Sequence, residues 1–201
     1  MYTALKKIWV IIYKINFDPV VEWEVLKSEP NTVAYHMKKM VLPVTACIAM
    51  ATFVGYFFES IAFGYSIVYV CIRTISAFCE AFFSLYVSFL IIYELCPGLG
   101  LINGRENLFK LMTYSFSTFW ITSFIAGILA NYKTLDEFLR FLGLFGIYLF
   151  WIGSGTLLTF AVNKKSKFFI ISVAVILVCY YMIHWSFGYV LTAARFPGIF
   201  N

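Results

Sequence analysis

The stretch FFIISVAVILVCYYMIHWSFGYVL, residues 168–191, decides the fold class, because it contains no Asp, Glu, Lys or Arg. The hydrocarbon core of a bilayer is about 30 Å thick and an α-helix rises about 1.5 Å per residue, so about 20 mostly apolar residues cross it. Four earlier stretches are of similar length and character. The five predicted spans are Val41–Ser60, Thr74–Ile92, Leu111–Ala130, Phe141–Val162 and Phe168–Leu191.

The composition agrees with a membrane protein. Hydrophobic residues make up 62% of the chain, charged residues 12%, and the mean hydropathy is +0.87, values far from those of soluble domains. In lipid only helices or closed barrels satisfy every backbone group, and continuous apolar runs favour helices. The sequence therefore predicts an all-α polytopic membrane protein, with a cytoplasmic helical head over residues 1–39 and a five-helix transmembrane domain over residues 40–201.

The distribution of basic residues predicts the orientation. Most lie before the first span, between the second and third, or between the fourth and fifth: Lys6, Lys7, Lys14, Lys27, Lys38, Lys39, Arg105, Lys110, Lys164, Lys165 and Lys167. The opposite side has only Arg73, Lys133, Arg140 and Arg195. The positive-inside rule places the N-terminus in the cytoplasm and the C-terminus outside the cell membrane. The net charge of +5 is thus a topology signal, and no nucleic-acid partner is expected.

Processing and metal signals are weak. The apolar run Ile8–Tyr13 is too short for a signal peptide, and no small-residue cleavage site follows it. The five cysteines are scattered and form no C-x-x-C pair. We expect no disulfide framework, metal site or cofactor.

The segment Thr3–Ile15 has the pattern of an amphipathic helix. Apolar residues recur at helical spacing, while Lys6, Lys7 and Lys14 tend to the other side. Two interpretations are open. The helix lies in the membrane interface and binds anionic lipids through these lysines, or it packs on the cytoplasmic ends of the spans.

A short second helix is expected from Asp18 to about Ser28. Asp18 is a typical N-cap residue, Pro19 suits the first helical position, and Trp23 follows one turn later on the same face. The dipeptide Glu29-Pro30 ends the helix, because the residue before proline resists the α conformation. His36, beside the basic cluster, is expected to be solvated or in contact with lipid headgroups.

The stretch NFDPVVEWEVLK, residues 16–27, which includes Asp18, Pro19 and Trp23, resembles the cytoplasmic motif of bacterial members of the Yip (Ypt-interacting protein) domain family. KLMTYS at 110–115 and LFGIYLFWIG at 144–153 are similar to that family's third and fourth spans. In this chain Ser117 and Thr118 stand where the family often has proline. The resemblance covers almost the whole chain and implies a five-pass protein of the bacterial cytoplasmic membrane.

Eukaryotic Yip proteins are associated with Rab-type GTPases, vesicle traffic and organelle shape. This chain lacks their long polar N-terminal region, so no Rab partner is expected. The resemblance implies a membrane-organising or partner-binding protein without catalysis. No H-E-x-x-H, Walker or serine-elbow motif points to an enzyme.

Acidic residues and a histidine within the spans are the candidate functional residues, because such groups are costly in hydrocarbon. Glu59 and Glu94 lie near span ends, where they can reach interfacial water, and Glu59 is also a candidate member of an intramembrane polar site. Glu80 is roughly 9 Å below Thr74 by helical rise, and His184 has a similar depth. The two residues form either a structural hydrogen bond between packed helices or a polar site of a small transporter or channel. A metal site at this pair is the least supported reading.

Small and hydroxyl residues predict close helix contacts. Gly143, Gly146 and Gly153 make a smooth strip on the fourth span, which favours tight intramolecular packing, with a homodimer interface as the alternative. The third span carries many hydroxyls, expected to face other helices or a solute path: Thr113, Ser115, Ser117, Thr118, Thr122 and Ser123.

Overall fold

The computed structural model describes residues 2–64, 66–102, 104–130, 133–161 and 164–195. These residues are mostly helical, and their only β-structure is a single bridge between Leu101 and Phe160. The predicted all-α class is confirmed. The elements are α1 (Tyr2–Phe17), α2 (Pro19–Lys27), α3 (Val33–His36), the π-helix η1 (Met37–Val41), α4 (Leu42–Phe63), α5 (Ile67–Leu99), α6 (Arg105–Ser115), α7 (Ser117–Ile128), α8 (Lys133–Gly143), α9 (Phe145–Leu157) and α10 (Lys165–Arg195).

Five helical units are long and apolar enough to cross a membrane, as the sequence predicts. Most extend beyond the predicted limits, because hydropathy detects only the apolar part of a helix. The first unit begins at Val33, inside the segment assigned to the head, and the second covers Ile67–Leu99. The predicted end of the fourth span, Val162, lies outside the described residues.

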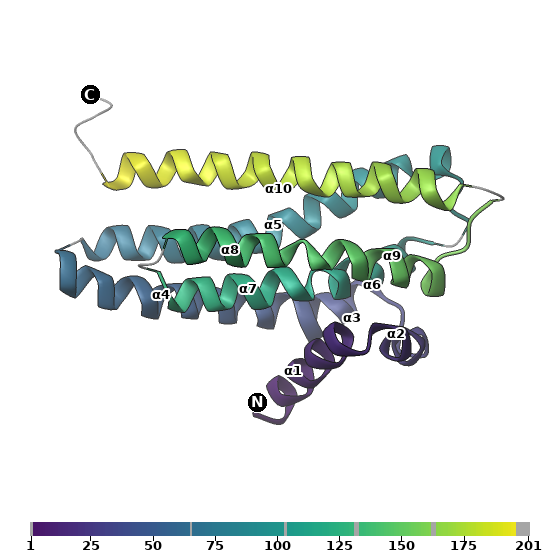
Figure 1. Cartoon of the computed structure of the whole chain (residues 1–201), viewed down its shortest axis with the longest axis horizontal. Helices are drawn as coiled ribbons and strands as arrows, with labels where there is room; N and C mark the ends of the chain where they lie inside the picture. Colours follow the sequence, from purple (N-terminus) through teal and green to yellow (C-terminus); the bar gives the residue numbers. More distant parts are fainter. Residues whose placement is uncertain (1, 65, 103, 131–132, 162–163, 196–201) are drawn as a thin grey trace.

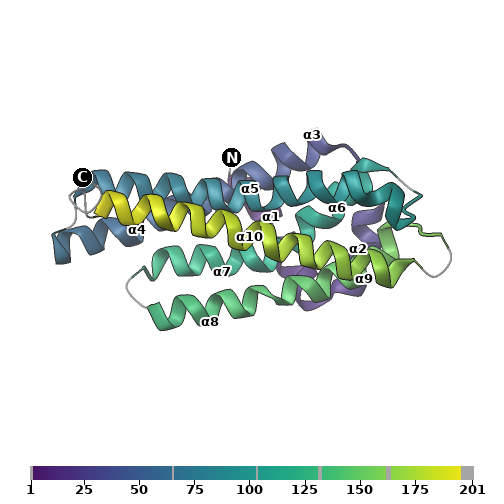
Figure 2. The ribbon, with the colours of Figure 1, turned by 90° about the horizontal axis from the view of Figure 1, so that it is seen from above.

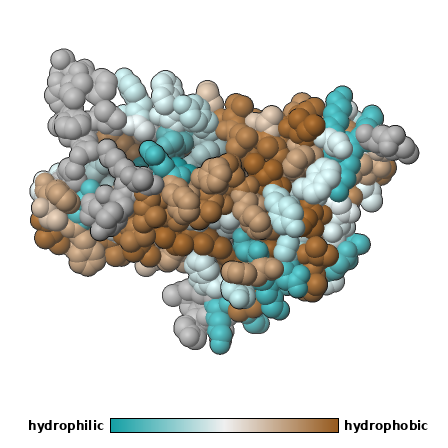
Figure 3. Space-filling view, viewed as in Figure 1, coloured by the Kyte–Doolittle hydropathy of each residue, from teal (hydrophilic) through white to brown (hydrophobic). Residues whose placement is uncertain are grey.

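The long helices pack in the order α10, α5, α4, α7, α8 (Figures 1 and 2). Helix α5 is the centre of this arrangement, since both α4 and α10 pack against it. Hydrophobic residues cover most of the visible face in Figure 3, while hydrophilic residues gather near α1 and where α10 begins. This distribution matches a helical bundle surrounded by lipid.

The third and fourth spans are each broken near their middle. A turn at Phe116 separates α6 from α7, and one at Leu144 separates α8 from α9. The first break needs no proline: the amide of Asn16 on α1 donates to Ser117 Oγ at 3.1 Å, and Thr118 Oγ1 donates to Asn16 Oδ1 at 2.6 Å. These two hydroxyls therefore join α1 to the break.

At the end of the bundle where α6 and α10 begin, the two connecting loops pair with each other. The backbone N–H of Ile102 donates to Thr159 at 3.0 Å, and that of Ala161 donates to Gly100 at 2.9 Å. Gly100 has φ = 72°, a left-handed conformation that glycine adopts without strain. These contacts fix the ends of four helices relative to one another.

Candidate functional site

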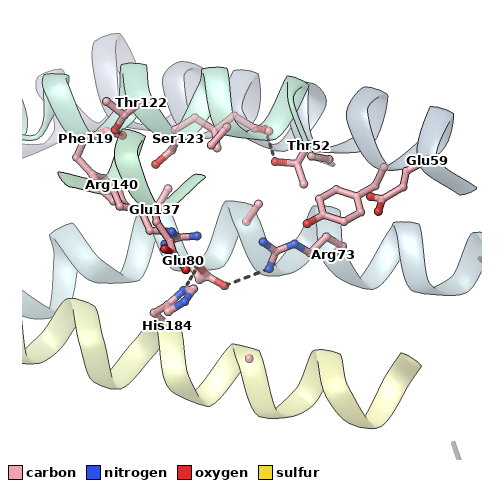
Figure 4. Close-up of a pocket in the computed structure, with 18 of the residues that line it drawn as sticks. Thr52, Glu59, Arg73, Glu80, Phe119, Thr122, Ser123, Glu137, Arg140 and His184 are labelled. Carbon is pink, nitrogen blue, oxygen red and sulfur yellow. Dashed lines mark hydrogen bonds and ion pairs between the residues drawn. The ribbon is translucent and has the colours of Figure 1, made fainter. Parts of the chain in front are cut away.

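A cavity of about 610 Å³ lies among α4, α5, α7, α8 and α10 (Figure 4). It is in the half of the bundle where α4 ends and α5 begins, away from α2 and α3. Its walls are polar for a membrane domain. Charged and imidazole side chains on the walls are Glu59, Arg73, Glu80, Glu137, Arg140 and His184, and the hydroxyl residues are Thr52, Tyr56, Tyr69, Thr122 and Ser123.

The structure brings the predicted pair Glu80 and His184 together. His184 Nδ1 lies 3.0 Å from Glu80 Oε2, which joins α5 to α10. The pair is deeper along the helices than the sequence suggests. Since α5 begins at Ile67, Glu80 lies about 20 Å along the helix axis from its start, at about 1.5 Å per residue.

Arg73 is a second partner of Glu80. Its Nη1 atom lies 3.9 Å from Glu80 Oε1, and its guanidinium carbon lies 5.2 Å from the ring centroid of Tyr56. The cation and the imidazole therefore flank the carboxylate from two sides, as Figure 4 shows. Each contact offsets part of the cost of removing Glu80 from water.

Sequence reasoning missed Arg73 because it lies just before the predicted second span and was counted as a loop charge. The spacing between Arg73 and Glu80 could have indicated that they lie together. Arg73 and Glu80 are seven residues apart, about two helical turns, so a helix that begins earlier places them on one face.

Among the buried atoms of this wall, Arg73 Nε and Glu80 Oε1 have no hydrogen-bond partner within the part of the chain that the structure describes. Nearly all buried polar atoms in folded proteins have such a partner. The hydrogen-bonding capacity of these two atoms is unused, and both belong to side chains that line the cavity.

The remaining charged groups come from α4 and α8. Glu59, for which interfacial water and the polar site were both open, lies on the cavity wall. Glu137 and Arg140 also line it, and the Arg140 guanidinium donates to the Tyr180 hydroxyl of α10. The sequence pattern did not predict a place in the site for Glu137 and Arg140, because they precede the predicted start of the fourth span.

The hydroxyls of the third span have different surroundings. Thr122 and Ser123 line the cavity, whereas Ser117 and Thr118 bind Asn16. Only part of the predicted set therefore belongs to the polar site.

The glycine strip lies inside the bundle. A Cβ atom at Gly143 would lie 3.3 Å from Thr122 Oγ1, and one at Gly146 would lie 2.6 Å from the carbonyl oxygen of Ser115. At Gly153 the neighbour is the Trp23 ring, at 2.5 Å. These glycines serve intramolecular packing in this structure.

The head is joined to the spans by a second polar cluster. The Lys110 side chain is 1% exposed and donates to the carbonyl oxygens of Leu26 and Glu29, both at 2.9 Å. The Glu29 carboxylate accepts from Lys39 at 2.7 Å and from the Tyr114 hydroxyl at 3.0 Å. Lys110 and Lys39 were read as topology signals, and the structure adds a packing role.

The residues of the Yip-like motif lie against these spans. Trp23 is fully buried and makes an edge contact with Tyr114. Pro19 occupies the first turn of α2, while Asp18 is at the N-cap position without a capping side-chain hydrogen bond. The expectation that His36 is solvated or in contact with headgroups was wrong, because its side chain is fully buried beside Tyr114.

Helix α1 packs on the bundle through its apolar face. Ile8, Ile12 and Ile15 are buried, and Trp9 makes an edge contact with Phe124 of α7. The lysines at positions 6, 7 and 14 are exposed. For this face the structure favours packing on the spans over insertion into lipid.

Among the described residues, no group of three His, Cys, Asp or Glu is placed to hold a metal ion. Comparisons with family models, curated proteins and solved structures found no match to this chain. The Yip resemblance therefore stays a prediction from the quoted motifs.

Proposed function

We propose that this protein binds a small polar solute inside the membrane, in the cavity between α4, α5, α7, α8 and α10, as the site of a transporter or channel. The observation that carries this proposal is the set of Arg73, Glu80 and His184 on one cavity wall. Charged groups inside a membrane are costly and mark ligand or ion pathways by default.

The wall favours a ligand that carries both charges. Arg73 and Arg140 attract anionic groups, and guanidinium geometry suits carboxylate and phosphate. Glu59, Glu80 and Glu137 attract a cation in the same space. A zwitterion therefore complements the cavity better than an ion of either sign.

The test is a thermal-stability screen of the full chain in nanodiscs, with small zwitterions that include phosphoethanolamine. We expect at least one to raise the melting temperature of the wild type, and Arg73→Gln and Glu80→Gln to lose this shift. Glu94→Gln is the matched control, because Glu94 is exposed on the same helix. A panel that shifts no melting temperature, or shifts the cavity variants as much as the wild type, contradicts the proposal.

A second candidate function rests on α1 and α2. Their outward surface combines exposed apolar side chains, including Tyr13, Phe17 and Val20, with the exposed lysines of α1. A basic surface with apolar side chains attaches to anionic lipid headgroups. The corresponding role is membrane organisation through the head, as the Yip resemblance implies.

Hydrogen exchange separates this second role from the first. We expect the amides of α1 to be better protected in nanodiscs with anionic lipid than in neutral ones, and the triple variant Lys6→Gln, Lys7→Gln, Lys14→Gln to remove the difference. Lys38→Gln is an exposed control outside α1. Equal protection of wild-type α1 in both lipids would exclude anionic-lipid binding by the head.

A further inference from the structure

An apolar crevice of about 90 Å³ adjoins the polar cavity. It lies where α7, the α8–α9 region and α10 meet, and it shares Phe119 and Arg140 with the cavity. Most of its walls are apolar side chains, among them Leu144, Ile147, Phe150, Val173, Ile176 and Leu177. Two spaces of opposite character therefore meet at one arginine.

The crevice follows from how the helices pack. Helix α8, which leads into α9, packs on α7, whereas α10 packs on α5. Helices α9 and α10 therefore make few contacts with each other. Gly143 and Gly146 also line the crevice, where their backbone packs closely against Ser115, Phe119 and Thr122. Leu144 and Leu177 are 43% and 41% exposed, so the crevice borders the lipid-facing surface.

We infer that the ligand of the cavity is an amphiphile, a lipid whose polar head enters the cavity and whose acyl chain begins in this crevice and leaves it toward the lipid-facing surface. The inference rests on the proposed function and names its substrate class. Arg140, held by the Tyr180 hydroxyl, stands at the junction of the two spaces, where the head of such a molecule joins its chain.

The direction of the crevice supports a lipid. It extends from Arg140 and Tyr180 toward Phe150 and Val173, which lie nearer the end of the bundle where α10 begins. A molecule bound in both spaces has its head toward one membrane face and its chain toward the bilayer middle. Lipids of that leaflet already have this orientation.

The cavity wall specifies the head group. Arginine binds phosphate through paired N–H donors, and Arg73 has a buried Nε without a hydrogen-bond partner among the described residues. Glu59, Glu80 and Glu137 line the same cavity and complement an ammonium group. A phosphate ester that carries an amine, as in phosphatidylethanolamine, satisfies both.

The test compares two probes on the delipidated full chain in a maltoside detergent: lysophosphatidylethanolamine and its soluble head, glycerophosphoethanolamine. Melting temperature is measured against probe concentration. We expect both probes to stabilise the wild type, with an apparent affinity at least tenfold higher for the lysolipid. The variant Val173→Phe fills the crevice, so it should reduce this ratio to about one and leave binding of the soluble head unchanged.

Val178→Phe is the control, because Val178 is on the same helix but 62% exposed and outside the crevice. It should keep the tenfold ratio. Equal affinities of the two probes for the wild type, or a ratio that Val173→Phe does not change, would overturn the amphiphile and leave solute binding intact. Lysolipid binding that Arg73→Gln and Glu80→Gln do not weaken would instead overturn the polar cavity as the binding site, and with it the proposed function.

Discussion

Glu80 is a carboxylate in the middle of a membrane helix, and two neighbours lower the cost of placing it there. His184 Nδ1 is within 3.0 Å, and Arg73 approaches the other oxygen to 3.9 Å. The imidazole contact is the closer and joins two helices that are far apart in the chain. The arginine contact is looser, and Glu80 Oε1 has no hydrogen-bond partner among the described residues.

A double-mutant cycle measures the contact between Glu80 and His184. Glu80→Gln and His184→Gln should not add independently, and the coupling should be about 1 kcal/mol, as for other interhelical hydrogen bonds in membranes. The measurement is the free energy of unfolding in one detergent for the wild type, both single variants and the double variant. Strict additivity would mean that the two side chains are neighbours without mutual stabilisation.

Lys110 is buried almost completely, yet two carbonyl oxygens of the head accept its hydrogen bonds. We expect Lys110→Met to lower the stability by about 1–3 kcal/mol, because it leaves these buried acceptors unsatisfied. Lys38→Met, at an exposed position, should change it by less than about 0.5 kcal/mol. Thermal unfolding of both variants checks this, and equal effects would show that Lys110 does not hold the head.

At the scale of elements, the length of the apolar stretches predicted the five spans, because about 20 apolar residues in any order form a helix long enough to cross the bilayer. The first and last residues of the helices were harder to predict from the sequence. Thr74 was the predicted start of the second span, but α5 continues back to Ile67, where Ser66 accepts a hydrogen bond from Tyr69 as the N-cap. The break at Phe116 depends on Asn16, a residue far away in the sequence.

Helix α2 docks on α9 through one glycine. A Cβ atom at Gly153 would lie 2.5 Å from Trp23 and 2.7 Å from Leu111, and both neighbours are fully buried. Gly153→Ala should therefore destabilise the protein by about 1–3 kcal/mol through overpacking. Gly98→Ala is the control, because nothing lies within 4 Å of its Cβ position. A melting temperature that falls equally in both variants would argue against close docking of Trp23.

At the scale of the whole molecule, the site could be predicted only in part. Matching depth predicted that Glu80 and His184 meet, since depth in a membrane is readable from span positions. The sequence did not predict that the site includes Arg73, Glu137 and Arg140. Their charges place them outside the apolar runs, although the helices extend over them. The cavity also depends on which helices are neighbours, and apolar runs carry no such information.

Orientation decides which side of the membrane the cavity serves. The basic residues gather at the end where α10 begins, so we expect the N-terminus and the loop at Gly104 in the cytoplasm and the C-terminus outside. The cavity lies in the opposite half of the bundle and would then belong to the outer leaflet.

Reporter fusions after Gly104 and after Asn201, a residue outside the described ranges, measure the orientation directly. The first should be active only as a cytoplasmic reporter and the second only as an exterior one, because an odd number of spans separates them. If both fusions report the same side, three crossings after Gly104 are contradicted. If both are reversed, the cavity lies in the cytoplasmic leaflet, and a lipid ligand would have to come from that leaflet.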